Sequence, residues 1–369
     1  MNQISFEVNK QAFHQWQYHT TTVPSELAEG QIVIAVDKFA LTANNISYAV
    51  MGEQLGYWRF FPASNDELGR LPAMGYGVVV ESNHPEIKTG ERLWGFFPMA
   101  SHLVIEAGKV NKMGFYDVAP YRENLAPLYS YFERVAASPT YVEALEDYDI
   151  LLRGLFTTSW LINDFFYDNE FFNAEQFLIT SASSKTSIAL AFAIKQSGHS
   201  KTIGITSSSR VDYVKSLNIY DNVISYDEVE TLNSKSASLL VDMAGNQHTL
   251  KAVHQHFGDQ LKYSCLVGVT HFQELAIDLA LPGPKPIMFF APHQMQKRTQ
   301  EWGREVLLER LAKSLFSFIQ FSQSQFTIDR LLINDTESQQ AFAQRYLAVL
   351  SGQSDASTGL INQIVSTDK

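Results

Sequence analysis

The residues best placed for chemistry are hydroxyl side chains and one lysine that follow a short apolar run. The run Phe177–Ile179 leads into Thr-Ser-Ala-Ser-Ser-Lys-Thr-Ser, residues 180–187, and apolar residues then recur at helical spacing at 188, 190, 191 and 194. This pattern predicts a buried strand, a tight turn and a covering helix. With a second strand at 202–206 it predicts a βαβ unit, whose first helix begins where such folds bind phosphate.

The predicted turn lacks the glycines of a dinucleotide-binding loop. A G-x-G-x-x-G loop would have glycine where this chain has Ser181, Ser184 and Ser187. Hydrogen bonds to charged groups stabilise by about 1.5–3 kcal/mol each, against about 0.3–1 kcal/mol for the helix end alone. Serine hydroxyls and the Lys185 ammonium could therefore replace what glycine gives through close backbone approach. The alternative is a serine-rich cap on an ordinary βαβ helix that binds no ligand.

A second polar segment bears on the choice of cofactor. The strand at 202–206 is followed by Ser-Ser-Ser-Arg, residues 207–210, with no Asp or Glu to hold a ribose 2′-hydroxyl. Hydroxyls with an arginine suit a 2′-phosphate instead. Given a nucleotide site, this segment favours NADP(H) over NAD(H). The alternative is a serine-capped helix with a solvated Arg210.

Composition limits the classes of function. The 369 residues are long for one core, so two domains are expected. A net charge of −11 argues against a nucleic-acid partner or an anionic membrane. The single cysteine, Cys265, rules out an intramolecular disulfide, and the first residues lack a signal-peptide core, so we expect a cytoplasmic protein without a membrane span.

Metal and hydrolase chemistry find no support in the sequence. The ten histidines show no H-x-x-x-H spacing, and His254 and His256 would diverge on a helix. A G-x-S-x-G elbow is missing as well. The sequence therefore predicts no metal site.

Two regions with different patterns of secondary structure must position these residues, one of short strands and one in which strands and helices alternate. Residues 31–36, 76–81, 90–97 and 103–106 read as short strands separated by turn residues, which suggests a small barrel. An aromatic loop at 57–62 lies between the first two strands. Its aromatic side chains either line a ligand pocket or pack in the interior beneath the loop. From residue 175 onward strands and helices alternate, which implies a parallel sheet. The strands are expected at 177–181, 202–206, 223–225, 239–243, 264–269 and 286–290, and helices are expected from 185, at 210–217 and at 247–257. Further helices are expected at 151–166 and 299–321, and Lys297, Arg298, Glu301 and Arg304 are expected on a solvated face.

The order of several motifs resembles the medium-chain dehydrogenase/reductase superfamily, in its zinc-independent quinone and enoyl reductase branch. The residues that carry the resemblance are Phe39-Ala-Leu-Thr-Ala-Asn-Asn45, Met74-Gly-Tyr-Gly-Val-Val-Val80, Gly90-Glu-Arg-Leu-Trp-Gly95, Ile203-Gly-Ile-Thr-Ser-Ser, Val223-Ile-Ser-Tyr226, Val241-Asp-Met-Ala-Gly245 and Leu266-Val-Gly-Val-Thr270. The stretch 289–292, with Lys297-Arg298 and Glu301-Trp-Gly303, is similar to a poorly characterised bacterial subgroup.

The resemblance implies an α/β fold made of a GroES-like β-barrel domain and a Rossmann domain with a doubly wound parallel sheet. Residues 1–125, completed by 325–369, would form the barrel domain, and residues 126–324 the Rossmann domain. The cofactor would be NADP(H), and a homodimer would be ordinary for the superfamily. By motif position, the cofactor would be bound at Ser184, Lys185, Thr186, Ser187, Ser208, Arg210, Tyr226, Val267 and Thr270.

The activity implied is hydride transfer to a small apolar conjugated carbonyl, such as a quinone, an enone or an enoyl thioester. Asn45, where the family has an acid, would lie near the nicotinamide, and Tyr48, Asn45 and Tyr76 are the candidate donors to the substrate oxygen. Each tyrosine could instead be interior packing with a satisfied hydroxyl. The alternative function is a catalytically silent protein of the same fold that binds a nucleotide or a partner protein.

Overall fold

The computed structural model describes residues 1–138, 141–198, 200–243, 245–267 and 281–366. The chain divides into two compact units, Met1–Leu151 with Phe326–Lys369, and Leu152–Gln325. The expected boundary between 125 and 126 falls inside the first unit, because β9 (Tyr131–Arg134) pairs with two other strands there. The expected boundary between 324 and 325 differs from the observed one by a single residue.

Six antiparallel strands of the first unit close into a barrel. They follow the order β3 (Gln31–Leu41), β5 (Pro72–Ser82), β6 (Arg92–Pro98), β9, β8 (Gly114–Asp117) and β7 (His102–Gly108), and β7 pairs back with β3. Two glycines of the Met74–Val80 motif let β5 lie close to β3. A Cβ on Gly75 would lie 2.5 Å from the Lys38 carbonyl oxygen, and one on Gly77 would lie 2.6 Å from Ile34. The barrel strands therefore cross too closely there for any larger residue.

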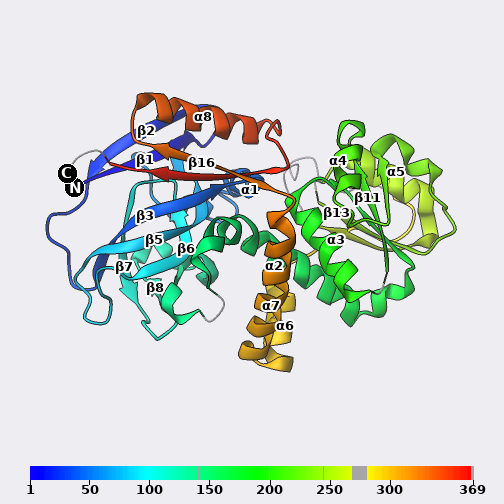
Figure 1. The fold of residues 1–369 in the computed structure, drawn as a ribbon, viewed down its shortest axis with the longest axis horizontal. Coiled ribbons are helices and arrows are strands. Elements are labelled where there is room, and N and C mark those ends of the chain that lie inside the picture. The colour runs from blue at the N-terminus through cyan, green and yellow to red at the C-terminus, as the bar shows by residue number, and fades with distance from the viewer. Residues whose placement is uncertain (139–140, 199, 244, 268–280, 367–369) are drawn as a thin grey trace. The chain divides into compact units, whose positions relative to one another are not determined.

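Other elements of the first unit cover this barrel. β1 (Asn2–Asn9) pairs with β2 (Trp16–Thr22) and β4 (Leu68–Arg70), and β17 (Thr358–Ile364) joins β3 to β16 (Thr327–Ile333). α8 (Thr336–Leu350) packs Phe342 against Phe6 and Phe39 of the strands. Figure 1 shows α8 beside β16. The C-terminal segment thus completes the barrel unit. α1 (Ala43–Val50) follows β3 directly.

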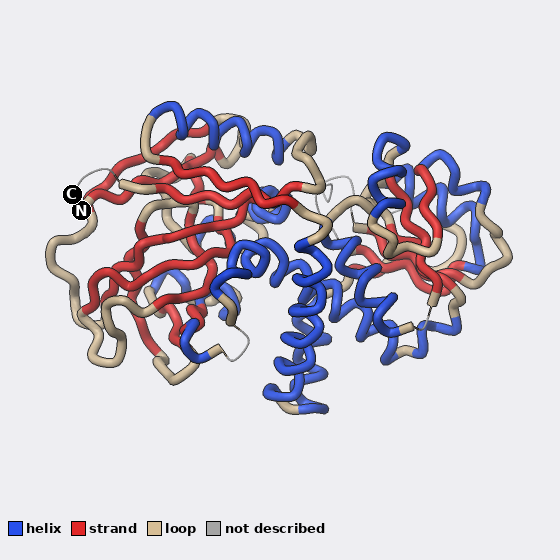
Figure 2. The backbone as a smooth tube through the Cα atoms, in the orientation of Figure 1, coloured by secondary structure: helices blue, strands red, loops and turns tan. Residues whose placement is uncertain are grey.

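The second unit is built on a six-stranded parallel sheet. Its order is β12 (Asn222–Ser225), β11 (Lys201–Thr206), β10 (Gln176–Ile179), β13 (Ser238–Asp242), β14 (Leu261–Leu266) and β15 (Ile287–Met288). The helices α3 (Lys185–Ser197), α4 (Val211–Ser216) and α5 (Gln247–Phe257) connect these strands and flank the sheet (Figure 2). The order reverses between β10 and β13, as in a doubly wound Rossmann sheet. The predicted α/β fold of a GroES-like barrel and a Rossmann sheet is confirmed.

The helices of the second unit differ from the expected ones in one respect. α2 (Glu146–Asp168) contains the helix expected at 151–166, but the single helix expected at 299–321 is two helices, α6 (Ala291–Trp302) and α7 (Arg304–Gln323). Gly303 has a φ of 82°, which ends one helix and begins the next in a sharp turn. None of the described helices is both long and apolar enough to cross a membrane.

Candidate functional site

The loop 180–187 lies where the order of the Rossmann sheet reverses. It follows β10, and Asp242 ends the neighbouring strand β13. The Thr180 hydroxyl donates to Asp242 Oδ1 over 2.6 Å and accepts from the N–H of Met243 over 3.0 Å. Ligands of open α/β sheets bind at this crevice, outside the carboxyl ends of the strands. Asp242, which is buried, thereby ties together the two strand ends that border the crevice.

Ser181 is the first of the three serines that the sequence has in place of loop glycines, and it has a left-handed backbone. Its φ is 49°, a conformation that costs a residue with a Cβ about 1–2 kcal/mol. Its N–H donates to the Tyr226 hydroxyl over 3.2 Å, and the two hydroxyls lie 3.4 Å apart. The tight turn that glycine makes in the family fingerprint is thus made here by a serine.

Ser184 and Ser187, the other two of these serines, bond to each other. Ser184 is the N-cap of α3, and its Oγ accepts from the Ser187 N–H over 3.2 Å and donates to the Ser187 Oγ over 2.9 Å. The fully buried Ser187 donates in turn to the Thr180 carbonyl over 2.9 Å. We expected these hydroxyls to donate to phosphate. Both protons are directed into the loop instead, so a phosphate here would have to be bound by main-chain N–H groups at the start of α3.

The neighbouring residues of the loop are held from several elements. Thr186 accepts through its carbonyl from Ser159 of α2 over 2.8 Å. The Ala182 N–H donates to the Ile205 carbonyl of β11, and the Tyr220 hydroxyl donates to the Ala182 carbonyl over 3.0 Å. Sequence reasoning missed Tyr220, because nothing in its surroundings marks a tyrosine before a short strand as a partner of this loop.

The segment after β11 is exposed and carries no carboxylate. Ser208 is exposed, and Arg210 ends the short helix η7 (Ser208–Arg210), where its N–H donates to the Ser207 carbonyl over 2.9 Å. Tyr226 begins η8 (Tyr226–Thr231) after β12, and its hydroxyl is directed at Ser181. Val267 follows β14, and its N–H donates to the Asp242 carbonyl over 2.9 Å. Thr270 lies outside the described residues.

Asn45 of the barrel unit has a structural set of bonds. Its Oδ1 accepts from the Thr42 N–H over 2.6 Å, which caps α1, and its Nδ2 donates to the Pro72 carbonyl over 2.7 Å. The side chain is buried, with an exposed fraction of 2%. These bonds fasten α1 to the start of β5. They need both an acceptor and a donor on one side chain, which an amide provides and a carboxylate does not.

Tyr76 is interior, with its hydroxyl proton committed to a carboxylate. The hydroxyl donates to Asp149 Oδ2 over 2.8 Å, and the Arg92 guanidinium lies 5.2 Å from the ring centre. Asp149 belongs to the first turn of α2, as do the buried Glu146 and Asp147. Lys38 and Arg92 pair with Glu146, and Lys38 and Arg330 with Asp147. Tyr76 thus belongs to a charged network that anchors the start of α2 on the barrel unit.

Tyr48 lies in a group of aromatic rings on the same unit. Its ring centre is 4.7 Å from that of Tyr57, 5.4 Å from Phe96 and 6.2 Å from Tyr129. The Tyr57 hydroxyl donates to the Tyr129 hydroxyl over 3.4 Å. Burial, and then the neighbouring phenols, raise the pKa of Tyr48 well above its usual value. Tyr48 therefore carries its proton at neutral pH.

The aromatic loop 57–62 packs as part of the barrel core. Trp58, Phe60 and Phe61 are buried in the core cluster of the first unit. Arg59 is exposed, and its guanidinium donates to the carbonyls of Tyr121 and Glu123 over 3.2 and 2.9 Å. The sequence left open whether these aromatic side chains line a ligand pocket or pack in the interior, and Trp58, Phe60 and Phe61 pack in the interior.

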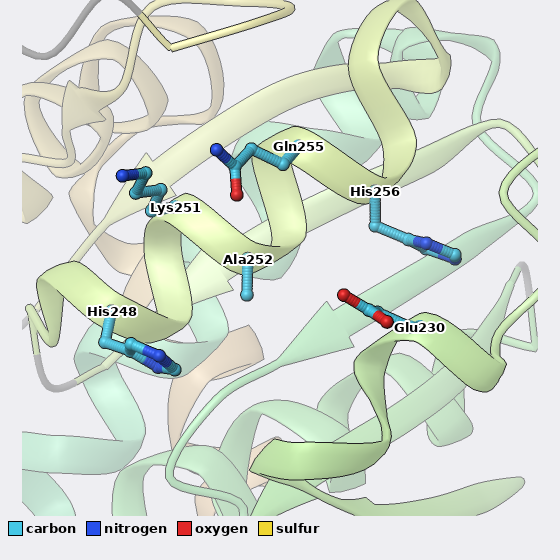
Figure 3. A pocket seen from close by; sticks show the side chains of 6 residues that line it. All are labelled: Glu230, His248, Lys251, Ala252, Gln255 and His256. Carbon is cyan, nitrogen blue, oxygen red and sulfur yellow. The ribbon is translucent and has the colours of Figure 1, made fainter.

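A separate surface hollow of about 640 Å³ lies on the Rossmann unit, between α5 and η8. Figure 3 shows its six lining residues, of which Glu230 comes from η8 and the others from α5. His256 bonds to the Leu232 carbonyl over 2.8 Å. Among the described residues, no three His, Cys, Asp or Glu side chains gather in a way that could hold a metal ion.

Comparison with known proteins places the chain in a family. One family model matches residues 39–355, and its description is "Protein of unknown function (DUF2855)". The chain belongs to this family. No curated protein matches its sequence.

Several solved structures share the fold over the whole chain. CurA from Vibrio vulnificus in complex with NADPH has a TM-score of 0.61 at 12% identity, over 99% of both chains. The yhdH oxidoreductase from Salmonella enterica in complex with NADP has a TM-score of 0.53 at 13% identity, over 99% of this chain and all of that one. CurK enoyl reductase has a TM-score of 0.51 at 12% identity, over 98% and 99%. At these identities the likeness shows the fold alone, a GroES-like barrel with a Rossmann sheet.

Proposed function

We propose that this protein is a zinc-independent, NADPH-dependent reductase that transfers hydride to a small apolar conjugated carbonyl compound. The observation that carries the proposal is the loop 180–187 at the reversal of the Rossmann sheet, followed one strand later by Ser207–Arg210 without a carboxylate. Structures of the same fold in complex with NADPH or NADP support it. A quinone, an enone or an enoyl thioester would be the substrate.

The residues present fit a dinucleotide in most parts of the loop. The N–H groups at the start of α3 and the Lys185 ammonium would hold the pyrophosphate, with Thr186 beside them. Ser184 and Ser187 would shape the loop through their mutual hydrogen bonds. Ser208 and Arg210 would hold the adenosine 2′-phosphate. Val267 and Thr270 would lie at the nicotinamide ribose.

The chain must also stabilise the negative charge that develops on the substrate oxygen. NADPH supplies the hydride when bound, so the protein contributes orientation and a hydrogen-bond donor. Tyr48 is the donor we propose, because a phenol can donate a hydrogen bond at neutral pH and its aromatic neighbours offer an apolar surface. Asn45 donates to Pro72 and Tyr76 to Asp149 within the barrel unit, so these two side chains would have a structural part there.

A specific observation favours a second candidate, a catalytically silent protein of the same fold. The hydroxyl protons of Ser184 and Ser187 are both used inside the loop, and Ser184 already caps the Ser187 N–H. A phosphate would have to do without that N–H. Such a protein would bind a nucleotide or a partner protein without turnover.

One titration separates these functions. The intact protein is titrated with NADPH and with NADH while nicotinamide fluorescence is followed, and a panel of quinones, enones and enoyl thioesters is then added. We expect saturable binding of NADPH, weaker binding of NADH, and oxidation of NADPH with at least one carbonyl class. Binding without oxidation across the panel supports the silent protein. Failure to bind either nucleotide would overturn both nucleotide-based proposals.

A further inference from the structure

The loop 180–187 is held from one side by two tyrosines. They stand just before and just after strand β12, at positions 220 and 226, and both hydroxyls bond to the first residues of the loop. Strand β12 is two strands away from β10, which the loop follows, with β11 between them. Both side chains must therefore reach across the end of β11.

Tyr226 bonds to the one loop residue with a left-handed backbone. Its hydroxyl accepts from the Ser181 N–H over 3.2 Å and lies 3.4 Å from the Ser181 Oγ. The φ of 49° at Ser181 belongs to the region that glycine occupies without steric cost and serine does not. The hydrogen bonds of Tyr226 are therefore made to Ser181, the loop residue whose backbone conformation is unfavourable without such support.

Tyr220 bonds to Ala182, the next residue of the loop, and its ring packs against Gly204 of β11. Its hydroxyl donates to the Ala182 carbonyl over 3.0 Å. A Cβ on Gly204 of β11 would lie 2.9 Å from the Ala182 Cβ and 3.1 Å from the Tyr220 ring. The space that lets strand, loop and tyrosine pack closely is thus provided by a glycine in β11, while the loop itself has none.

We propose that Tyr226 and Tyr220 form a clamp that positions a glycine-free dinucleotide loop, with Tyr226 holding Ser181 in its left-handed conformation. The inference rests on the proposed function and deepens it. Tyr226 is then a positioning residue for the pyrophosphate loop, whereas its motif position implied contact with the 2′-phosphate. Loss of the clamp populates loop conformations that do not bind, which lowers the apparent affinity for any dinucleotide.

The test is a set of variants titrated with NADPH and with NADH. Tyr226→Phe leaves the Ser181 N–H without its acceptor, and we expect both nucleotides to bind about three- to tenfold more weakly, by the same factor. Adding Ser181→Gly to this variant should bring both affinities back to within about twofold of the wild type, because glycine adopts the required φ freely. Tyr263→Phe in β14 removes a tyrosine hydroxyl elsewhere in the same unit, and it should leave both affinities unchanged.

A second measurement keeps the two proposals apart. Amide hydrogen exchange of the segment 180–188 is followed in the free wild type and in Tyr226→Phe and Tyr220→Phe, with the thermal midpoint of each variant as a check on folding. The clamp predicts faster exchange in both variants. If the wild type binds neither nucleotide, the proposed function fails, and this exchange alone decides whether the tyrosines hold the loop.

Two results would overturn the clamp. A loss for NADPH without a loss for NADH, not rescued by Ser181→Gly, would make Tyr226 a ligand of the 2′-phosphate. Unchanged exchange in the segment 180–188 of folded Tyr226→Phe would mean that its hydroxyl does not hold the loop.

Discussion

Arg210 is the residue on which discrimination between NADPH and NADH should depend. It follows three serines at the end of β11, and the segment 207–210 itself holds no carboxylate. A charge-assisted hydrogen bond stabilises by about 1.5–3 kcal/mol, so Arg210→Ala should weaken NADPH binding by about tenfold or more. NADH lacks the 2′-phosphate and should bind as before. Nicotinamide fluorescence titrations with both nucleotides measure the two affinities.

The matched control for this change is Lys201→Ala. Lys201 is an exposed cation that begins the same strand, at the end opposite Arg210. Its loss changes the net charge equally but removes no group from the proposed site, so both affinities should stay close to wild type. An equal loss of NADPH and NADH affinity in Arg210→Ala would discard the assignment of the phosphate to this residue.

His254 gives the Rossmann unit a dependence on pH. The side chain is fully buried, with Nδ1 2.8 Å from the Pro282 carbonyl and Nε2 2.9 Å from the Ser264 hydroxyl. Burial lowers its pKa from 6.5, although the bond to the Pro282 carbonyl opposes this. Below pH 6.5 the unfolded chain therefore binds a proton that the folded chain refuses, so the stability present above pH 6.5 is lost as the pH falls.

The measurement is urea unfolding at pH 7.5, 6 and 5, for the wild type and for His254→Gln. Other groups also titrate in this range, so the quantity of interest is the difference between the two proteins. We expect the wild type to be more stable at pH 7.5 and its advantage to shrink toward pH 5. An advantage that stayed constant over this range would show that His254 does not titrate in the way its burial requires.

The residue types at the site could be recognised from the sequence, but their partners could not. The serines at the fingerprint positions and the missing carboxylate after β11 follow from spacing along one strand–turn–helix. The bonds of Tyr226 to Ser181 and of Thr180 to Asp242 join residues 45 and 62 positions apart. Such pairings depend on strand order and register, which hydrophobic periodicity leaves open.

Among the elements, α6 shows how a motif can be recognised and its role misjudged. Lys297, Arg298 and Glu301 were expected on a solvated face, but Arg298 is buried and pairs with Asp164 and Asp168 of α2 over 2.7 and 3.1 Å. Its guanidinium also lies 4.5 Å from the Trp302 ring centre. A run of charged residues reads as exposed unless the opposing carboxylates, about 130 residues earlier in the chain, are known to face it. The motif thus docks α6 on α2.

This docking predicts unequal effects for two adjacent cations. Arg298→Ala would leave Asp164 buried without its charge partner, so the free energy of unfolding should fall by about 3–5 kcal/mol. Lys297 pairs with Asp168 as well, but its side chain is 46% exposed, so Lys297→Ala should cost at most about 1 kcal/mol. Guanidinium chloride unfolding compares them. Equal losses in the two variants would mean that Arg298 does not anchor the helix.

Elements with clear periodicity were predicted well, and those defined by long-range pairing were not. The helix expected at 247–257 is α5 with the same bounds, and the strands of the parallel sheet lie within a few residues of their expected places. β1, β2, β16 and α8 were not assigned, because the half-exposed strands among them lack a continuous apolar run. β1 is placed by its pairing with β4, and β16 by its pairing with β17, and local sequence patterns do not reveal these partners.

For the whole molecule, the two edges of the Rossmann sheet differ in a way that bears on assembly. The edge strand β12 begins at the exposed Asn222, after the exposed Asp221. The opposite edge, β15, exposes Ile287 by 50% and Met288 by 37%, and Phe290 beside it by 57%. Charged and polar residues protect an edge strand from pairing, and apolar ones invite it. We therefore expect two copies to pair through β15.

A dimer formed in this way should come apart when a charge is placed on that edge. Antiparallel pairing of two β15 strands about a two-fold axis brings each Ile287 against the same strand of the other copy, so a single substitution acts twice. Light scattering after size exclusion should give the wild type twice the mass of one chain, and Ile287→Lys the mass of one. Leu55→Lys, at an equally exposed apolar residue of the barrel unit, should remain a dimer. A monomeric wild type would mean that the chain does not form this dimer. An Ile287→Lys variant that stays dimeric would mean that the dimer forms through another surface, because this variant differs from the wild type only at residue 287.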